Sequence, residues 1–259
     1  MPDADPISAI AKAVRSARHV VVLTGAGVSA ESGTPTFRDA MTGLWASFNP
    51  QELATPEAFE KNPELVTRWY DQRRIGCMAC APNPGHLALA RLEEQLTARG
   101  GRFTLLTQNV DRLHHRAGSI NVVELHGTIM VWRCTRTGRE FTPPAEPMTE
   151  FPPRSSEGGL LRPNVVWFGE MLPEPALAAA FEALQDCDLF LSIGTSSVVH
   201  PAASFIHIAK SAGAVTGEIN PESTPITPLV DFAARGKSGE LLPLILDRCG
   251  PQAPAGEGR

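Results

Sequence analysis

Residues 19–27 read His19-Val-Val-Val-Leu-Thr-Gly-Ala-Gly27, and this stretch decides the fold. A short, mostly β-branched apolar run that stops at glycine is typical of a strand buried on both faces. The glycines after the run allow a tight turn and a close approach of the backbone to a ligand, whose phosphate oxygens the following amides can face. The stretch therefore predicts a buried strand that leads into a glycine turn.

Strands and helices alternate on both sides of this stretch. Apolar runs predict further buried strands at residues 103–107, 122–125, 189–193 and 214–219. Helical spacing of apolar residues predicts helices at residues 7–17, 86–99, 175–185, 202–212 and 239–248. Such alternation is typical of a parallel sheet covered by helices on both faces. We therefore expect an α/β fold with a doubly wound, Rossmann-like parallel sheet.

Polar clusters follow the predicted strands. They are Gly25-Ala26-Gly27, Gln108-Asn109, His126-Gly127 and Gly194-Thr195-Ser196. Ligands of doubly wound sheets bind beyond the carboxyl ends of the strands. The coincidence predicts that these clusters build one shared site.

The composition excludes several classes of protein. The net charge is -5, and Lys and Arg are scattered, which argues against a nucleic-acid partner. No apolar run approaches the roughly 20 residues of a membrane span. The acidic N-terminus lacks the features of a signal peptide, so we expect a cytoplasmic protein. Five cysteines in 259 residues do not suggest a disulfide framework.

Two stretches, at residues 41–82 and 135–159, interrupt the alternation and read as insertions. We expect a single domain over residues 5–250. Its core would comprise about residues 5–40, 84–130 and 160–250, and a small lobe about residues 41–83 and 131–159. The tail at residues 251–259 is rich in Gly, Pro and Ala, and we expect it to be disordered.

The glycine turn alone is ambiguous, because its spacing is not Gly-x-Gly-x-x-Gly and a plain strand-to-helix turn would explain it. Five further motifs give it meaning, and all six are in order along the chain. They are residues 25–39, Gln108-Asn109-Val110-Asp111 with Leu113-His114, Glu124-Leu125-His126-Gly127, Val165-Val166-Trp167-Phe168-Gly169-Glu170, Gly194-Thr195-Ser196 and Glu218-Ile219-Asn220. Together they resemble the sirtuin family of NAD-dependent protein-lysine deacylases, over about residues 7–248.

The resemblance implies a set of contacts to the cosubstrate NAD. Asn109 and Asp111 would hold the nicotinamide end, and Gln108 would contact ribose. The residues expected to bind NAD are Gly25, Ala26, Gly27, Ser29, Glu31, Thr36, Phe37, Arg38, Gln108, Asn109, Asp111, Gly194, Thr195, Ser196, Asn220 and Ser238.

The resemblance also assigns the reaction. The acyl oxygen of a modified lysine attacks the ribose, and nicotinamide leaves. His126 then takes a proton from a ribose hydroxyl, and water completes the release of lysine and O-acyl-ADP-ribose. An imidazole with an ordinary pKa near 6.5 suits a general base at neutral pH. Taken alone, His126 could equally be a structural histidine at a strand end.

Two segments are expected to bind the acylated lysine of a protein or peptide. Val165, Val166, Trp167 and Phe168 would pair with the substrate backbone as an added strand, although a plain buried strand would show the same pattern. Tyr70 and Arg73 are three residues apart in a predicted helix and so share a face.

Arginine pairs bidentately with carboxylates, and a tyrosine hydroxyl can add a hydrogen bond. The Tyr-x-x-Arg pattern resembles the sirtuin class that removes acidic acyl groups. Succinyl-, malonyl- or glutaryl-lysine is therefore the expected substrate, with deacetylation as a possible second activity. The alternative is a surface helix with this spacing by chance.

The chain departs from the family at the zinc site, which in most sirtuins consists of two cysteine pairs. Cys134 stands at the first position, but Thr137 occupies the second, and residues 140–160 contain neither Cys nor His. One thiolate cannot hold a structural zinc, so we expect no metal. Cys77 and Cys80 lie in the other insertion and read as free thiols. The lobe is then expected to be held by apolar and proline packing, with candidates Phe141, Pro143, Pro144, Phe151, Pro152 and Pro153.

Two other functions remain open at this point. An NAD glycohydrolase or ADP-ribosyltransferase would send ADP-ribose to water or to a protein side chain, and the peptide-binding segment argues against it. A non-catalytic NAD-sensing module would keep the fold alone, and the presence of His126, Asn109 and Asp111 argues against that.

Overall fold

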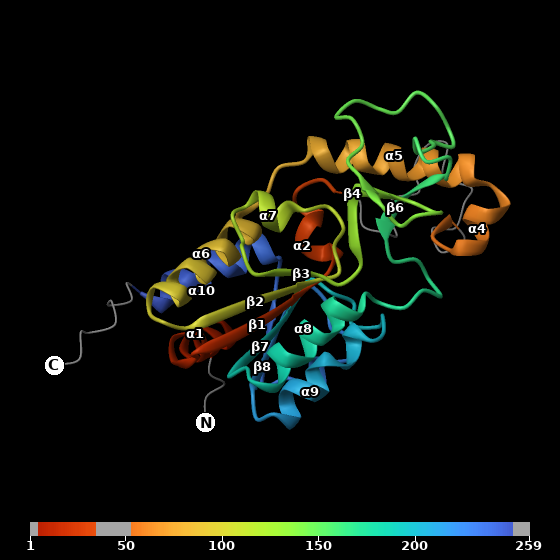
Figure 1. Ribbon diagram of the computed structural model, residues 1–259. Helices are drawn as coiled ribbons and strands as arrows, with labels where there is room; N and C mark the ends of the chain where they lie inside the picture. The colour runs from red at the N-terminus through yellow and green to blue at the C-terminus, as the bar shows by residue number, and fades with distance from the viewer. Residues whose placement is uncertain (1–4, 35–52, 251–259) are drawn as a thin grey trace.

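The computed structural model describes residues 5–34 and 53–250 (Figure 1). Thr36, Phe37 and Arg38, which the sequence assigns to NAD binding, lie outside the described residues. The tail at residues 251–259 does so as well.

Six parallel strands form the large sheet, in the order β3-β2-β1-β7-β8-β9. They are β1 (His19–Thr24), β2 (Arg102–Thr107), β3 (Val122–Glu124), β7 (Leu189–Ile193), β8 (Val215–Asn220) and β9 (Phe232–Arg235). In the register, Thr24 at the end of β1 is level with Thr107 on one side and Ile193 on the other. The doubly wound parallel sheet is therefore confirmed, and its strands end at one edge. The strand β9 is an addition that the sequence analysis does not predict.

Helices cover both faces of this sheet, as Figure 1 shows. One face carries α1 (Pro6–Ser16), α6 (Pro84–Ala98) and α10 (Ser238–Cys249), and the other carries α8 (Glu174–Gln185) and α9 (Phe205–Ser211). Val20 and Val22 of β1 pack into the first layer, and Val21 and Leu23 pack into the second. Successive side chains of a strand point to opposite faces, so a strand covered twice is apolar at every position.

Short elements complete this part of the chain. They are α2 (Ala26–Ala30), α7 (Leu113–Arg116), η2 (Ala202–Ser204) and η3 (Thr227–Leu229). The helix predicted at residues 202–212 thus begins with a 3-10 turn, η2, before α9. Among the described residues, no helix is both long and apolar enough to cross a membrane.

A second, antiparallel sheet of three strands forms the small lobe, in the order β5-β4-β6. Its elements are β4 (Gly127–Cys134), β5 (Glu140–Phe141) and β6 (Leu161–Val165), and they pack with α4 (Pro56–Lys61) and α5 (Pro63–Ala79). The register shifts between Thr128 and Trp132. This irregularity breaks the period-two pattern of β4, which the sequence analysis does not predict.

Of the six residues predicted to hold the small lobe, only Pro153 is buried, and the apolar cluster of the lobe is formed by other side chains such as Trp69 and Trp132. A buried ion pair on α5 contributes as well. The Arg74 guanidinium lies 2.6 Å from Asp71 and donates to the backbone carbonyls of Pro144 and Glu146 at 2.6 and 2.9 Å. The second oxygen of Asp71 accepts from the Met148 amide at 2.9 Å. These contacts fix the irregular loop at residues 144–148 to α5.

Candidate active site

Groups from the ends of four strands, β1, β2, β7 and β8, meet at the carboxyl edge of the large sheet. The Gln108 amide donates to the Thr195 hydroxyl at 3.0 Å, and the Asn109 amide donates to the carbonyl of Gly25 at 3.1 Å. The Asn220 amide donates to the carbonyl of Thr195 at 3.5 Å. The sequence clusters thus come together, as the fold requires.

The glycines of the first turn are explained by chain packing. A Cβ atom added to Gly27 would lie 2.7 Å from the carbonyl oxygen of Gly194, and one added to Gly25 would lie 2.7 Å from Cβ of Thr195. Real Cβ atoms essentially never approach other atoms that closely. Two strand-end loops therefore interlock at these glycines, and the predicted contact of Gly25 and Gly27 with a ligand stays a prediction.

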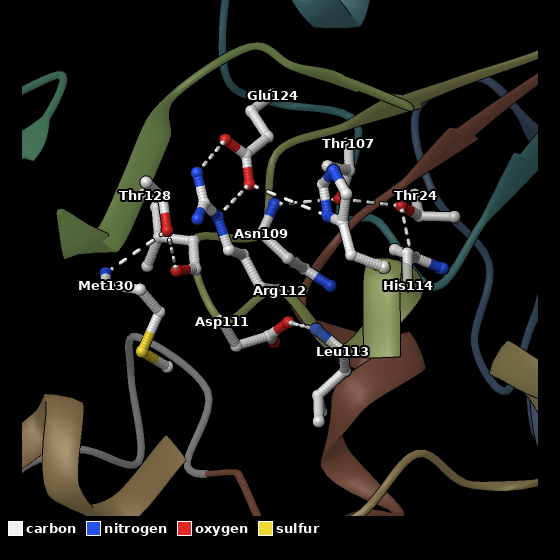
Figure 2. A network of polar contacts seen from close by, with 12 residues as sticks. Thr24, Thr107, Asn109, Asp111, Arg112, Leu113, His114, Glu124, Thr128 and Met130 are labelled. Carbon is white, nitrogen blue, oxygen red and sulfur yellow. Dashed lines mark hydrogen bonds and ion pairs between the residues drawn. The ribbon is translucent and has the colours of Figure 1, made fainter. Parts of the chain in front are cut away.

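A buried polar network lies around Asn109 (Figure 2). The Thr24 hydroxyl donates to the Thr107 hydroxyl at 2.9 Å and lies 3.0 Å from Nε2 of His114. Thr107 in turn accepts from the Asn109 backbone amide at 3.1 Å. His114 therefore supports the strand ends.

His86 extends this network, and the sequence analysis did not single it out. Its Nε2 lies 3.3 Å from the Ser29 hydroxyl, which accepts from the Asn109 side-chain amide at 3.1 Å. Burial lowers the pKa of His86 to about 4, partly offset by the Asp111 carboxylate. His86 stands three residues after Asn83, the N-cap of α6, and a residue at this position can take part in a capping box. In the structure, Asn83 and His86 form such a box.

Asp111 is buried beside these groups and accepts the Leu113 amide at 2.8 Å, which caps α7. Arg112 follows in a left-handed conformation, with φ of 60°, and its Nε lies 3.1 Å from a Glu124 oxygen. Figure 2 shows Asp111 and Asn109 on the same loop. The loop after β2 thus supplies both the amide and the carboxylate predicted to bind the nicotinamide end.

Among the residues that the structure describes, one backbone group orients His126. Its Nδ1 lies 3.1 Å from the carbonyl oxygen of Gln108. A carbonyl only accepts, so Nδ1 carries the hydrogen and Nε2 of the neutral ring keeps a free lone pair. Burial lowers the pKa of His126, and the bond to Gln108 opposes this effect. The ring is therefore neutral at pH 7 and able to accept a proton through Nε2.

Glu31 and Ser238, both expected to bind NAD, contact each other. One Glu31 oxygen accepts from the Gly239 amide at 2.8 Å and from the Ser238 hydroxyl at 3.3 Å. Glu31 thereby ties the loop after α2 to the first turn of α10. Ala26 and Ser29 lie in α2 itself, and Ser196 is exposed next to Thr195.

Ser197 is a polar residue of the loop after β7 that the sequence analysis missed. It adopts φ of 55°, it is buried, and its hydroxyl has no hydrogen-bond partner among the residues that the structure describes. Its amide donates to the Thr195 hydroxyl at 3.2 Å. A buried hydroxyl of this kind needs a partner, and a bound polar ligand would provide one.

The predicted acyl-binding pair lies on α5. The Tyr70 hydroxyl accepts a hydrogen bond from the Trp167 indole at 2.9 Å, and burial raises the pKa of Tyr70 to about 12. The Trp69 ring lies edge-on to the Tyr70 ring, with centroids 4.6 Å apart. The Arg73 guanidinium lies over the same Trp69 ring, 4.9 Å from its centroid. One tryptophan therefore contacts both members of the pair.

The segment expected to pair with substrate follows β6. Val165 is paired with Gly127 of β4. The amide of Val166 donates to the His126 carbonyl at 3.0 Å, and that of Phe168 donates to Ala54 at 2.9 Å. The Trp167 amide donates to Glu170 at 2.8 Å. These amide donors are used within the chain, so the predicted pairing with a substrate strand would rely on backbone carbonyls.

All five cysteines, at positions 77, 80, 134, 187 and 249, are free thiols. Within residues 5–34 and 53–250, no three His, Cys, Asp or Glu side chains group as a metal site would require. Cys134 is buried, and its sulfur lies 3.2 Å from the Ser155 hydroxyl. Cys187 and Cys249 are buried, as expected of small core residues.

Comparison with known proteins places this arrangement among described families. The model of the Sir2 family matches residues 25–201. The chain is 50% identical over 239 residues to NAD-dependent protein deacylase 2 of Pyrobaculum aerophilum, covering 92% of the chain and 94% of that protein. It is 49% identical over 230 residues to the NAD-dependent protein deacylase of Aquifex aeolicus, covering 88% and 94%.

Solved structures give the same result. A crystal structure of a Sir2 homologue–NAD complex aligns with a TM-score of 0.87 at 45% identity, covering 93% of each chain. A structure of Sir2 bound to an acetylated peptide aligns with a TM-score of 0.84 at 29% identity, covering 94% of this chain and 98% of the other.

Proposed function

The chain belongs to the Sir2 family, and we propose that this NAD-dependent protein deacylase prefers lysine acyl groups that end in a carboxylate. Relatives near 50% identity support the deacylase activity. The preference for succinyl-, malonyl- or glutaryl-lysine rests on one observation, which is the contact of Trp69 with both Tyr70 and Arg73.

The strand-end residues fit NAD. Asn109 and Asp111 would hold the carboxamide of nicotinamide, and the buried Ser197 hydroxyl fits a phosphate or ribose oxygen beside Thr195 and Asn220. NAD supplies an electrophilic ribose carbon with nicotinamide as its leaving group. The protein orients the reactants and excludes water around them.

The geometry of His126 supports its proposed role as the general base. Its Nδ1 is committed to Gln108, which leaves Nε2 as the proton acceptor. The loop that supplies Gln108 also supplies Asn109, so the base and the nicotinamide contacts are positioned by the same backbone. His126 would take the proton of a ribose hydroxyl and thereby activate its oxygen.

The acyl preference follows from the side chains on α5. A guanidinium that stacks on a ring uses its face, and its N–H groups lie at the edge, where a carboxylate can bind them in pairs. The Tyr70 hydroxyl adds a neutral donor in a buried setting, where hydrogen bonds to a charged group are strong. An acetyl group offers no carboxylate to these donors.

The direct test is turnover of one peptide carrying either succinyl-lysine or acetyl-lysine. We expect a higher kcat/KM for the succinyl peptide, and Arg73→Met should lower that value selectively. Arg68→Met is the matched control, because Arg68 lies on the same helix and pairs with Glu64 at the surface. Equal rates that Arg73→Met leaves unchanged would contradict the proposal. Mass spectrometry should find O-acyl-ADP-ribose, whereas free ADP-ribose alone would indicate a glycohydrolase.

We also propose that the small lobe contains no structural zinc. Cys134 contacts Ser155 rather than a second thiol, and the Thr137 hydroxyl donates to Glu157 at 2.6 Å. A Cβ atom at Gly159 would collide with the Cys134 sulfur, so the chain closes over that atom. Hydrogen bonds thus join the segment around Cys134 to the segment around Ser155, where most sirtuins have the two cysteine pairs of the zinc site.

A further inference from the structure

The Tyr70 hydroxyl and the Trp167 indole form a directed hydrogen bond of 2.9 Å between α5 and the segment after β6. Both side chains are buried, with 3% and 2% of their surfaces exposed. An indole N–H can only donate, so the tyrosine oxygen is the acceptor. The single hydrogen of the Tyr70 hydroxyl is then directed away from Trp167, and it remains a donor for another group.

Trp167 is itself held on two sides of its ring. The Arg162 guanidinium lies over the ring with its central carbon 3.3 Å from the centroid, and the Phe59 ring lies 5.3 Å away. Cation–π contacts of a buried arginine are among the stronger ones. The indole plane, and with it the direction of its N–H, is therefore fixed.

Glu170 connects this stack to the backbone. Its two oxygens accept from Arg162 at 2.6 and 2.9 Å, and one of them also accepts the Trp167 amide at 2.8 Å. The same guanidinium donates to the carbonyl of Val165 at 2.9 Å. Arg162 and Glu170 thus close a ring of contacts around both the backbone and the side chain of Trp167.

On its other side, Tyr70 contacts Trp69, the residue over which the Arg73 guanidinium lies. Tyr70 therefore lies between Trp167, whose indole N–H can only donate, and Trp69, over whose ring the Arg73 guanidinium lies. A carboxylate at Arg73 can accept a further hydrogen bond, and a hydroxyl whose oxygen accepts from an indole N–H has its own hydrogen available for that bond.

We propose that Trp167 is a positioning residue for acyl recognition, which holds the Tyr70 hydroxyl as a hydrogen-bond donor to the acyl carboxylate. This inference rests on the proposed preference for acidic acyl groups. A phenylalanine at position 167 would keep the ring stack but supply no donor. The direction of the Tyr70 O–H bond would then no longer be fixed, and the hydrogen bond to the carboxylate would be weaker.

The test is a double-mutant cycle of Trp167→Phe and Tyr70→Phe, with kcat and KM measured for succinyl and acetyl forms of one peptide. We expect Trp167→Phe to lower the succinyl-to-acetyl ratio of kcat/KM about tenfold, the size expected for a hydrogen bond to a charged group. In the Tyr70→Phe background, Trp167→Phe should not lower that ratio further, because the two residues act through one hydroxyl.

Trp132→Phe is the matched control. Trp132 belongs to the same apolar cluster and is 1% exposed, but its indole N–H has no hydrogen-bond partner among the described residues. This change should leave the ratio as it is. If Trp167→Phe fails to fold, benzothienylalanine at position 167 replaces only the N–H by sulfur and should lower the ratio by the same factor.

The outcomes separate the two proposals. A wild-type enzyme without a preference for the succinyl peptide removes the proposed acyl specificity and this inference with it. A wild-type preference that survives Trp167→Phe, or two substitutions whose effects on the ratio multiply, overturns only the positioning role of Trp167.

Discussion

The imidazole rings of His86 and His114 lie with their centroids 4.7 Å apart, beneath the loop that carries Asn109. Burial lowers the pKa of both, to about 4 for His86 and well below the usual 6.5 for His114. Two adjacent rings at this distance are tolerated because neither is charged. The predicted NAD site therefore includes a neutral histidine pair.

This pair predicts a loss of stability in mild acid. The unfolded chain binds protons near pH 6.5 and the folded chain does not, so the free energy of unfolding decreases as the pH falls from about 6.5 toward 4. His86 alone accounts for about 2 kcal/mol between pH 7 and pH 5. Urea unfolding at several pH values measures the slope. His114→Gln should flatten it, whereas His207→Gln, at an exposed position of α9, should not.

His126→Asn should abolish the proton transfer without removing the site. An asparagine cannot accept the proton, so we expect kcat to fall by about 100- to 10,000-fold. NAD binding, followed by calorimetry, should persist, because His126 is not among the predicted NAD contacts. Nicotinamide release measures turnover, with His207→Asn as the control. Retention of a tenth of the wild-type kcat would exclude His126 as the base.

Two helical glycines should respond oppositely to alanine. Gly27→Ala places a Cβ atom 2.7 Å from the Gly194 carbonyl, and we expect a loss of about 1–3 kcal/mol. Gly76 in α5 has no atom within 4 Å of the added Cβ, and alanine there should stabilise by about 0.5–1 kcal/mol. Chemical denaturation compares them. Equal changes in the free energy of unfolding would show that the loop after β7 can move away from a side chain at position 27 at little cost.

Arg74→Met should be far more costly than Arg68→Met. The first leaves the buried Asp71 carboxylate without its cation, at an expected cost of about 3–5 kcal/mol. The second removes a surface pair with 51% and 53% of its side chains exposed, which contributes less than about 1 kcal/mol. Unfolding curves in urea distinguish them, and similar midpoints would mean that the loop at residues 144–148 is anchored by other contacts.

Metal analysis of the purified protein should find zinc well below one atom per chain. Chelator should leave the melting temperature unchanged, and Cys134→Ser should cost only about 1 kcal/mol, because a hydroxyl can replace the thiol beside Ser155. A structural zinc would instead make chelation unfold the small lobe. One zinc per chain would overturn the proposal.

The large sheet was predictable because its strands are buried on both faces. Val20 to Leu23 are apolar at every position for that reason, and the polar residues that follow each strand had to meet at one edge. Strand β4 was not predictable, since its register shift after Thr128 hides the period of two. The motifs located Asn109 and Thr195, but the roles given to single residues remain predictions.

Contacts between distant segments escaped the sequence altogether. Trp167 and Tyr70 are 97 positions apart, and nothing local to either indicates that they share a hydrogen bond. His86 reads as part of a helix cap, and its approach to Ser29 depends on how α6 packs against α2. The first turn was predictable from its glycines, but its close packing against Gly194 and Thr195 of the loop after β7 was not.

The pairing of Gly127 with Val165 sets the mechanics of the site. The chain enters the small lobe directly after His126 and passes the same point again at Val165, where the Val166 amide bonds to His126. Any swing of the lobe about this pivot would hardly displace the base. Tyr70, in the middle of α5, is hydrogen-bonded to Trp167, two residues beyond Val165, and would stay close to this pivot as well. A movement of the small lobe about this point would therefore displace the predicted acyl-binding tyrosine little more than the proton acceptor.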